Sequence, residues 1–254
     1  CPADISVDTL KARDWLLSAH DEESRYQGVA AVKRSLDLAH TLGAGVIVVH
    51  SGNVHNDLSQ EQHLRSLYNA GLAGSDEYQN IKAQMEKDRL ALAGPRLEAV
   101  KKSLLELLEY AAPFGIRLGL ENRYHYMDMP TPDELEQLLE LAGPDRLGFI
   151  YDVGHAQALD RLGFFSHQAW LARFASRMFG AHLHDVQGVN DHQAPGLGDI
   201  DYQRIAAYIP PGAFRTLELH PKNTPEQVHA GLRYLAAHGC VHPLENQDQE
   251  KSDA

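Results

Sequence analysis

The sequence is poor in cysteine, in long apolar runs and in positive charge, and each shortage excludes a class of protein. Its two cysteines, Cys1 and Cys240, stand near opposite ends of the 254 residues. They therefore offer neither a disulfide framework nor the close spacing of a zinc knuckle. No apolar run approaches the roughly 20 residues that a membrane span needs. We expect a soluble protein with no membrane partner, and a reducing cytoplasm is the simplest compartment for it.

The charge balance is acidic, with 23 Lys and Arg against 35 Asp and Glu and a formal net charge of -12. Such a surface repels phosphate backbones, so nucleic acid is not an expected partner. Histidine, in contrast, is abundant at 15 residues. Because imidazole serves equally as metal ligand, proton carrier or surface group, only the positions of these residues can decide their role.

Apolar runs alternate with amphipathic stretches, a pattern typical of βαβ units and a parallel sheet. The runs predict strands at 45–50, 116–121, 147–152, 179–185 and 214–221. Helices are expected from Thr131, which is followed by a proline at the first helical position, and over 225–238. A strongly amphipathic helix is predicted to begin at Pro95.

The polar stretch at about 53–94 is interpreted as a helical insertion that covers the mouth of the sheet or contributes to a homodimer. Its Tyr68 and Tyr78 are expected on a solvated helical face. The fold class is α/β, and two architectures fit five strands: an open doubly wound sheet, or a (β/α)8 TIM barrel whose first three strands precede Cys1. We favour the barrel, as one domain over 1–243, followed by a polar tail at 244–254 that is expected to be disordered.

Potential metal ligands follow every predicted strand at its carboxyl end, where the active sites of parallel barrels form. In chain order these residues are His50, Glu121, Asp152 with His155, the group His182, His184 and Asp185, and Glu218 with His220. One such residue is more often structural, but five consecutive occurrences are hard to obtain by chance. Converging carboxylates repel one another unless a cation or protons neutralise them. One divalent ion (Mn, Co, Mg or Zn) bound by two Glu, one Asp and one His would do so.

The residues at 119–122, 151–156, 182–185, 191–201 and 217–220 resemble those of the xylose-isomerase-like barrel superfamily. That group includes sugar phosphate isomerases and epimerases, ketose 3-epimerases, inosose dehydratases and endonuclease IV. The resemblance extends from about His20 to Gly239. Its motifs are specific for the superfamily and weak for the substrate. The Cys1-Pro2 start also looks like the segment that follows a barrel strand.

The resemblance implies that Glu121, Asp152, His182 and Glu218 hold the metal and that the two glutamates form the acid/base pair. It places His155 beside the substrate. His182 is preferred as the ligand because the family's histidine stands three residues before an acidic residue, here Asp185. The alternative is His184, which we otherwise expect near the substrate or the barrel wall.

The leading hypothesis is a metal-dependent sugar or sugar-phosphate isomerase or epimerase, in which carboxylates move a proton through an enediolate stabilised by the metal. We expect His50, His155, His184 and His192 to line the pocket. Arg123 would bind a substrate carboxylate or phosphate, or else form a surface ion pair. An inosose-type dehydratase would use the same metal site. An endonuclease IV-like hydrolase of abasic DNA would need several metals, and the net charge of -12 disfavours binding of DNA. A non-catalytic, carbohydrate-binding barrel is the remaining alternative.

Overall fold

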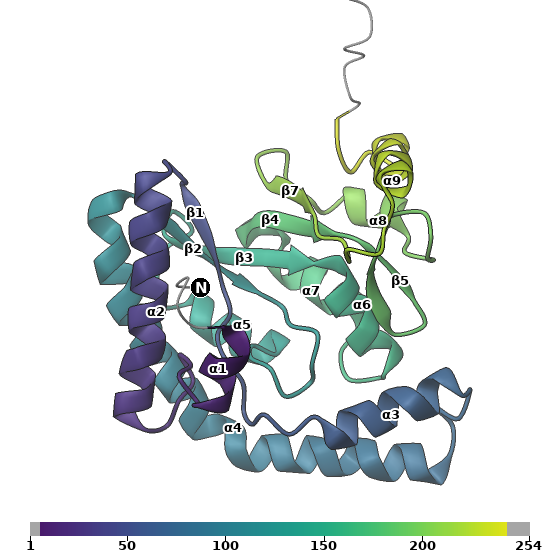
Figure 1. Cartoon of the computed structure of the whole chain (residues 1–254), viewed down its shortest axis with the longest axis horizontal. Coiled ribbons are helices and arrows are strands. Elements are labelled where there is room, and N and C mark those ends of the chain that lie inside the picture. Colours follow the sequence, from purple (N-terminus) through teal and green to yellow (C-terminus); the bar gives the residue numbers. More distant parts are fainter. Residues whose placement is uncertain (1–5, 243–254) are drawn as a thin grey trace, which may run out of the picture.

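The computed structural model describes residues 6–242, which form a five-stranded parallel sheet packed against helices (Figure 1). The strands lie in the order β1-β2-β3-β4-β7. Their bounds are β1 (Val46–Val49), β2 (Arg117–Glu121), β3 (Leu147–Asp152), β4 (Met178–Leu183) and β7 (Phe214–Leu217). This arrangement confirms the predicted fold class, a parallel α/β barrel that is incomplete. The predicted tail at 244–254 and the Cys1-Pro2 segment lie outside the described residues.

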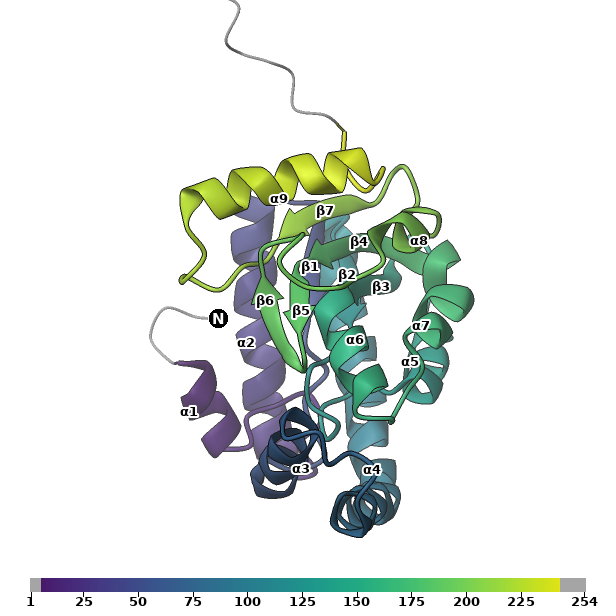
Figure 2. The same cartoon turned by 90° about the vertical axis from the view of Figure 1, so that its right-hand side faces the viewer.

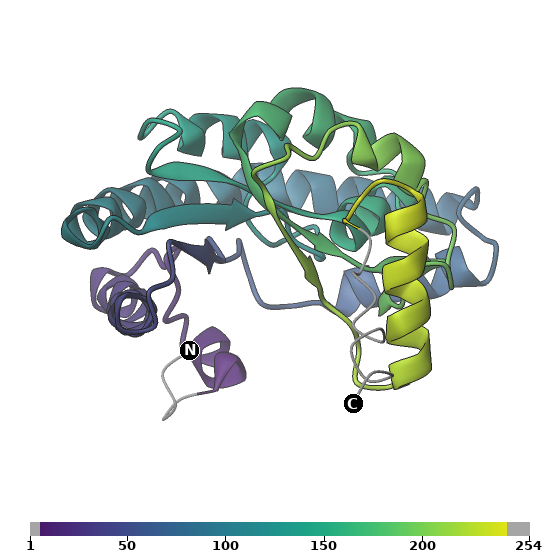
Figure 3. The same ribbon diagram turned by 90° about the horizontal axis from the view of Figure 1, so that it is seen from above.

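Helices cover one face of the sheet, and α2 and α9 lie at its two ends (Figure 3). A short antiparallel hairpin, β5 (Asp185–Gln187) and β6 (Asn190–Gln193), stands beyond β4 (Figure 2). The helical elements are α1 (Val7–Ala12), α2 (Glu22–Thr41), α3 (Ser59–Asn69), α4 (Asp76–Ala111), η1 (Ala112–Phe114), α5 (Pro132–Leu139), α6 (Val153–Arg161), α7 (His167–Phe174), η2 (Ala175–Arg177), α8 (Tyr202–Ala206) and α9 (Pro225–Ala237).

Side-chain alternation along the strands separates a helix side from an inner side of the sheet. On the helix side of β3, Phe149 stacks on Trp170 of α7 with ring centroids 5.9 Å apart. On the inner side, Gly148 leaves room for a neighbouring ring, because a Cβ atom there would lie 2.5 Å from Phe179. The inner side is therefore filled closely by large side chains set against glycines, as expected for a barrel interior.

Two helix predictions meet different outcomes. Thr131 does begin α5, with a capping box that its side chain forms with Glu134. The predicted start of a helix at Pro95 is wrong, because α4 begins at Asp76 and continues through that proline to Ala111. Pro95 cannot donate a hydrogen bond to the preceding turn. The helix continues because it packs along its length, against α3 in one part and against α2 in another.

The insertion at about 53–94 is helical, as predicted, and pairs α3 with the first part of α4 (Figure 1). The expectation of a solvated face at Tyr78 is wrong. Its side chain is buried among Leu64, Met85 and other apolar residues, and its hydroxyl donates to the main-chain oxygen of Leu162 at 3.0 Å. The insertion thus packs on the end of α6. Among residues 6–242, none of the helices has the length and apolar character to cross a membrane.

Candidate metal centre and active site

Four side chains from four successive strands of the sheet meet on its inner side. Each of Glu121, Asp152, His182 and Glu218 offers one potential ligand atom, and these atoms all lie within 4.8 Å of one another. His182 Nδ1 is 2.7 Å from Glu121 Oε1, 2.7 Å from Glu218 Oε2 and 3.6 Å from Asp152 Oδ2. Strand register produces this convergence, since Asp152 and His182 are direct partners across β3 and β4. Glu218 follows β7, which ends at Leu217, four residues before the predicted end of this strand at 221.

Burial raises the free-energy cost of keeping the carboxylates of this cluster ionised. Glu121 is 1% exposed and Asp152 is fully buried, so both carboxylates have lost most of their water. Burial disfavours the protonated imidazole of His182, but Asp152 and Glu218 outweigh it and raise its pKa to about 9. Within residues 6–242, Asp152 Oδ2 and His182 Nδ1 are buried without a hydrogen-bond partner, and Glu121 Oε1 lies 2.7 Å from the same ring nitrogen. Two carboxylate oxygens and one imidazole nitrogen that meet in this way suit a divalent ion.

His184 supports Asp152 from behind. Its Nε2 lies 2.8 Å from Asp152 Oδ1, and its Nδ1 accepts a hydrogen bond from the His192 main-chain N–H at 2.7 Å. Nε2 must therefore carry the ring proton and donate it to the carboxylate. Both ring nitrogens of His184 are occupied, so it has no nitrogen free to ligate an ion in this arrangement. Asp152 Oδ1 also accepts from the His155 main-chain N–H and thereby caps α6.

His155 and His192, both predicted to line the substrate pocket, lie beside this group together with Asp191. His155 Nδ1 lies 3.0 Å from the Asn122 main-chain oxygen, to which it donates. Burial lowers the pKa of His155 to about 4, which leaves the ring neutral with Nε2 able to accept from a hydroxyl. His192 adopts a φ of 57° and stacks on His184 with ring centroids 4.3 Å apart. Its Nε2 lies 3.6 Å from Glu218 Oε1.

His50 and Arg123 lie on the other side of the cluster, over Glu121. His50 Nε2 is 3.1 Å from Glu121 Oε2 and 2.9 Å from Arg123 Nη1. The Arg123 guanidinium also contacts Glu121 Oε2 directly. Arg123 therefore does form an ion pair, but this pair is not on the surface. Its partner is a buried residue of the cluster, and the Arg123 side chain is only 16% exposed.

Two strand-end residues do not join the cluster. Asp185 accepts hydrogen bonds from the main-chain N–H groups of Val186, Gly196 and Ile200, so it fixes the loop after the β5–β6 hairpin. His220 Nδ1 accepts from the Lys222 main-chain N–H at 3.1 Å, outside the four-residue group.

The sequence interpretation gave no role to Asn122 or Asp191. The Asn122 amide joins β2 to β3, accepting from the Asp152 N–H and donating to the Asp152 oxygen, both at 2.8 Å. Asp191 Oδ1 lies 3.0 Å from His192 Nδ1, and its Oδ2 lies 3.5 Å from His155 Nε2. Asn122 directly follows Glu121, and Asp191 directly precedes His192. This adjacency to predicted site residues was the one feature of the sequence that could have pointed to Asn122 and Asp191.

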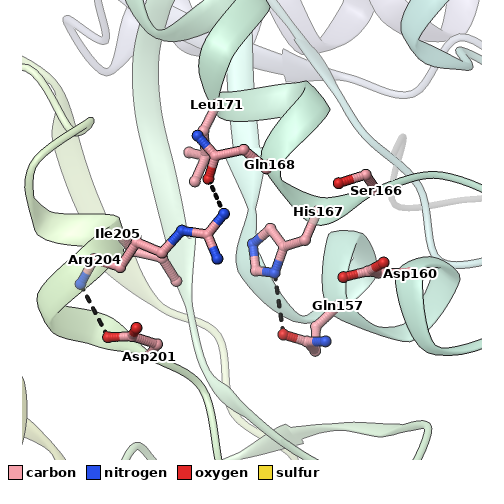
Figure 4. A pocket seen from close by; sticks show the side chains of 9 residues that line it. All are labelled: Gln157, Asp160, Ser166, His167, Gln168, Leu171, Asp201, Arg204 and Ile205. Atoms are coloured by element: carbon pink, nitrogen blue, oxygen red, sulfur yellow. Dashed lines mark hydrogen bonds between the residues drawn. The ribbon is translucent and has the colours of Figure 1, made fainter.

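A separate hollow of about 130 Å³ lies between α6, α7 and α8 (Figure 4). His167 contacts the hydroxyl of Tyr151, which points to the helix side of β3, away from Asp152. The other ring nitrogen of His167 lies 3.1 Å from Gln157 Oε1, and Arg204 contacts Gln168. Ligand sites usually measure about 300–1,000 Å³. This hollow is too small to hold a sugar.

A parallel barrel with carboxylates and imidazole at its strand ends defines the class of this protein. The chain belongs to the xylose isomerase-like TIM barrel family, whose model matches residues 5–238. Among curated relatives, it is 30% identical over 119 residues to an inosose dehydratase of Geobacillus kaustophilus and 29% identical over 106 residues to an uncharacterised protein of Methanocaldococcus jannaschii. These matches cover 46% and 41% of this chain but only 36% of each relative.

Solved structures confirm the fold at low sequence identity. A D-tagatose 3-epimerase-like protein has a TM-score of 0.61 and 19% identity, covering 88% of this chain and 72% of that one. The 3-keto-D-glucoside 4-epimerase of E. coli has a TM-score of 0.60 and 16% identity, covering 87% and 75%. The IolI protein with a zinc atom bound has a TM-score of 0.60 and 16% identity, covering 86% and 71%.

Proposed function

We propose that this chain carries the active site of a divalent-metal-dependent sugar isomerase or epimerase. The observation that carries the proposal is the placement of Glu121 and Glu218, each 2.7 Å from the same ring atom of His182. Epimerases among the similar structures and an inosose dehydratase among the relatives support a reaction on a keto sugar.

The proposed ligands are Glu121, Asp152, His182 and Glu218, which together supply three oxygens and one nitrogen. An ion held there would polarise neighbouring sugar oxygens and so acidify the carbon-bound proton between them. The mixed oxygen and imidazole set suits Mn, Co, Mg or Zn.

The glutamates would move the proton. Glu121 and Glu218 come from β2 and from the end of β7, with β3 and β4 between them, so they can face opposite sides of a bound sugar. One, as a carboxylate, would remove a proton from carbon, and the other, in its protonated form, would donate its own proton to the opposite face or to the adjacent carbon. The neutral Nε2 of His155 would accept from a sugar hydroxyl, while His50, His192 and Arg123 would line the mouth.

Metal content and proton exchange test this proposal. We expect one divalent ion per chain, and the metal-loaded protein should exchange a carbon-bound proton of a ketose with D2O. Glu121→Gln and Glu218→Gln should each abolish the exchange, whereas Glu109→Gln, an exposed residue of α4, should leave it unchanged. Wild-type exchange in both cluster variants would overturn the proposal.

A dehydratase is the second candidate, favoured by the match to the inosose dehydratase. The same proton removal would then be followed by loss of a hydroxyl group as water. Mass spectrometry separates the two reactions, because epimerisation conserves substrate mass and dehydration lowers it by one water.

A phosphodiesterase of abasic DNA is not proposed. It would need further metal ligands, and the nearest group is His155, His184 and His192, whose ring nitrogens also lie within 4.8 Å of one another. Both nitrogens of His184 are committed to hydrogen bonds. The net charge of -12 also opposes binding of a polyanion.

A further inference from the structure

A polar cavity of about 530 Å³ opens beside the proposed metal centre, between the β5–β6 hairpin and the segment after β7. It shares Asp191 with the surroundings of the cluster, and Asp191 contacts both His155 and His192. His192 in turn approaches Glu218. The cavity thus borders the side chains that surround the cluster, and its size lies within the usual range for ligand sites.

Uncharged amides dominate the lining of this cavity. Gln187 Nε2 donates to the Leu197 oxygen at 2.6 Å, and Gln193 Nε2 donates to the Asp191 oxygen at 3.0 Å. Gln187 and Asn190 are exposed at the edge of the cavity, and Gln193 is half-buried in its lining. The cavity therefore presents uncharged amide donors and acceptors, which match sugar hydroxyl groups.

The same cavity is poorly equipped for a phosphate. Helix α9 begins beside it, but the Thr224 N–H donates to Gln227 Oε1 at 2.8 Å and the Gln227 N–H donates to Thr224 Oγ1 at 3.3 Å. Pro225 has no N–H to give. This capping box uses main-chain donors with which helix N-termini bind phosphates. The lining holds one lysine, Lys222, and one aspartate, Asp191, so these two side chains together supply no net positive charge for a phosphate.

We propose that this cavity binds a second, neutral sugar unit, so that the substrate is a glycoside of a keto sugar and not a sugar phosphate. The inference rests on the proposed function, because the cluster must hold the reacting ring for the cavity to hold its substituent. The attached unit would hydrogen-bond to Asn190, Gln187 and Gln193.

Binding to the metal-loaded protein tests the inference without requiring turnover. Calorimetry compares D-fructose, D-fructose 6-phosphate and the four glucosyl-fructoses linked through O3, O4, O5 and O6. We expect at least one disaccharide to bind about tenfold or more tightly than fructose, which corresponds to about 1.4 kcal/mol. Fructose 6-phosphate should gain nothing. If the phosphate binds most tightly, or if no disaccharide exceeds fructose, the inference is overturned.

Variants of the cavity lining test whether the gain in disaccharide affinity arises in this cavity. The double variant Asn190→Ala with Gln193→Ala should lower the ratio of disaccharide to fructose affinity to about one, while Gln62→Ala, an exposed amide on α3, keeps the wild-type ratio. Lys222→Gln should also keep it. An unchanged ratio in the double variant would place the second sugar elsewhere and overturn the inference.

The two proposals can fail separately. Ketose turnover without a disaccharide preference contradicts the cavity inference alone. Tight disaccharide binding that depends on Asn190 and Gln193, with no proton exchange on any sugar, contradicts the proposed reaction and leaves the binding inference standing.

Discussion

Arg65 and Tyr124 are 59 positions apart in the chain, yet Arg65 Nη2 donates a 2.7 Å hydrogen bond to the Tyr124 main-chain oxygen. The guanidinium also lies over the Tyr124 ring, 3.9 Å from its centroid. Arg65 Nη1 donates to the Val189 oxygen at 3.2 Å, and the Tyr124 hydroxyl donates to the same oxygen at 2.6 Å. Helix α3 thus joins the loop that carries Arg123 to the hairpin that carries His192.

We predict that Arg65→Met destabilises the protein by about 3–5 kcal/mol, because it removes one of the two ion-pair partners of the buried Glu61 carboxylate, the other being His125. Hydrogen exchange should also rise in the hairpin at 187–193. Denaturant unfolding and exchange measured by mass spectrometry check both effects. Lys82→Met, which removes a more exposed pair with Glu86, serves as the control and should cost about 1 kcal/mol or less. Equal losses in the two variants would contradict this prediction.

Glu61 also predicts a pH dependence of stability. Burial raises the pKa of its carboxyl, but His125 and Arg65 outweigh burial and hold the pKa below the ordinary value of 4.5. A lowered pKa in the folded state stabilises the fold above pH 4.5, and this contribution is lost as the pH falls through the folded-state pKa. The difference in unfolding free energy between wild type and Glu61→Gln should therefore be constant from pH 7 to about 4.5 and shrink below it. A difference that grows on acidification would contradict the assignment.

His184 is expected to act as a positioning residue for Asp152. Removing its Nε2 donor with His184→Phe should weaken binding of the divalent ion by about 10–100-fold, as is typical when a hydrogen bond to a metal ligand is lost. His184→Gln, whose amide nitrogen can reach a similar place, should lose less. Metal titration by calorimetry measures both, with the exposed His63→Phe as control. Equal affinity in wild type and His184→Phe would remove this role.

The sequence could predict those parts of the molecule that depend on local pattern. Buried parallel strands are short apolar runs, and their carboxyl ends lie on one side, so the convergence of Glu121, Asp152 and His182 was readable in advance. Side-chain contacts between distant segments have no local pattern. The bonds of Arg65 to Tyr124 and Val189 depend on how the insertion packs, and neither composition nor periodicity encodes that packing. The same reason explains why Tyr78 was misplaced.

Pro95 illustrates the opposite error, in which a local rule was overridden by packing. Pro95→Ala should restore a main-chain donor in the middle of α4 and stabilise the protein by up to about 3 kcal/mol, measured by urea unfolding. Gly94→Ala should add about 1 kcal/mol, since a Cβ atom there meets open space. A loss of stability in Pro95→Ala would mean that the proline itself makes contacts that α4 needs.

The pairing of β3 with β4 gives the proposed metal site a second use, as a measure of correct folding. Asp152 faces His182 only in the observed alignment of these strands. A shift of one residue would turn the Asp152 carboxylate toward the apolar side near Trp170 and scatter the donors. Only molecules whose sheet has formed in this register would therefore bind the ion tightly. A metal titration during refolding would then measure the yield of native chains.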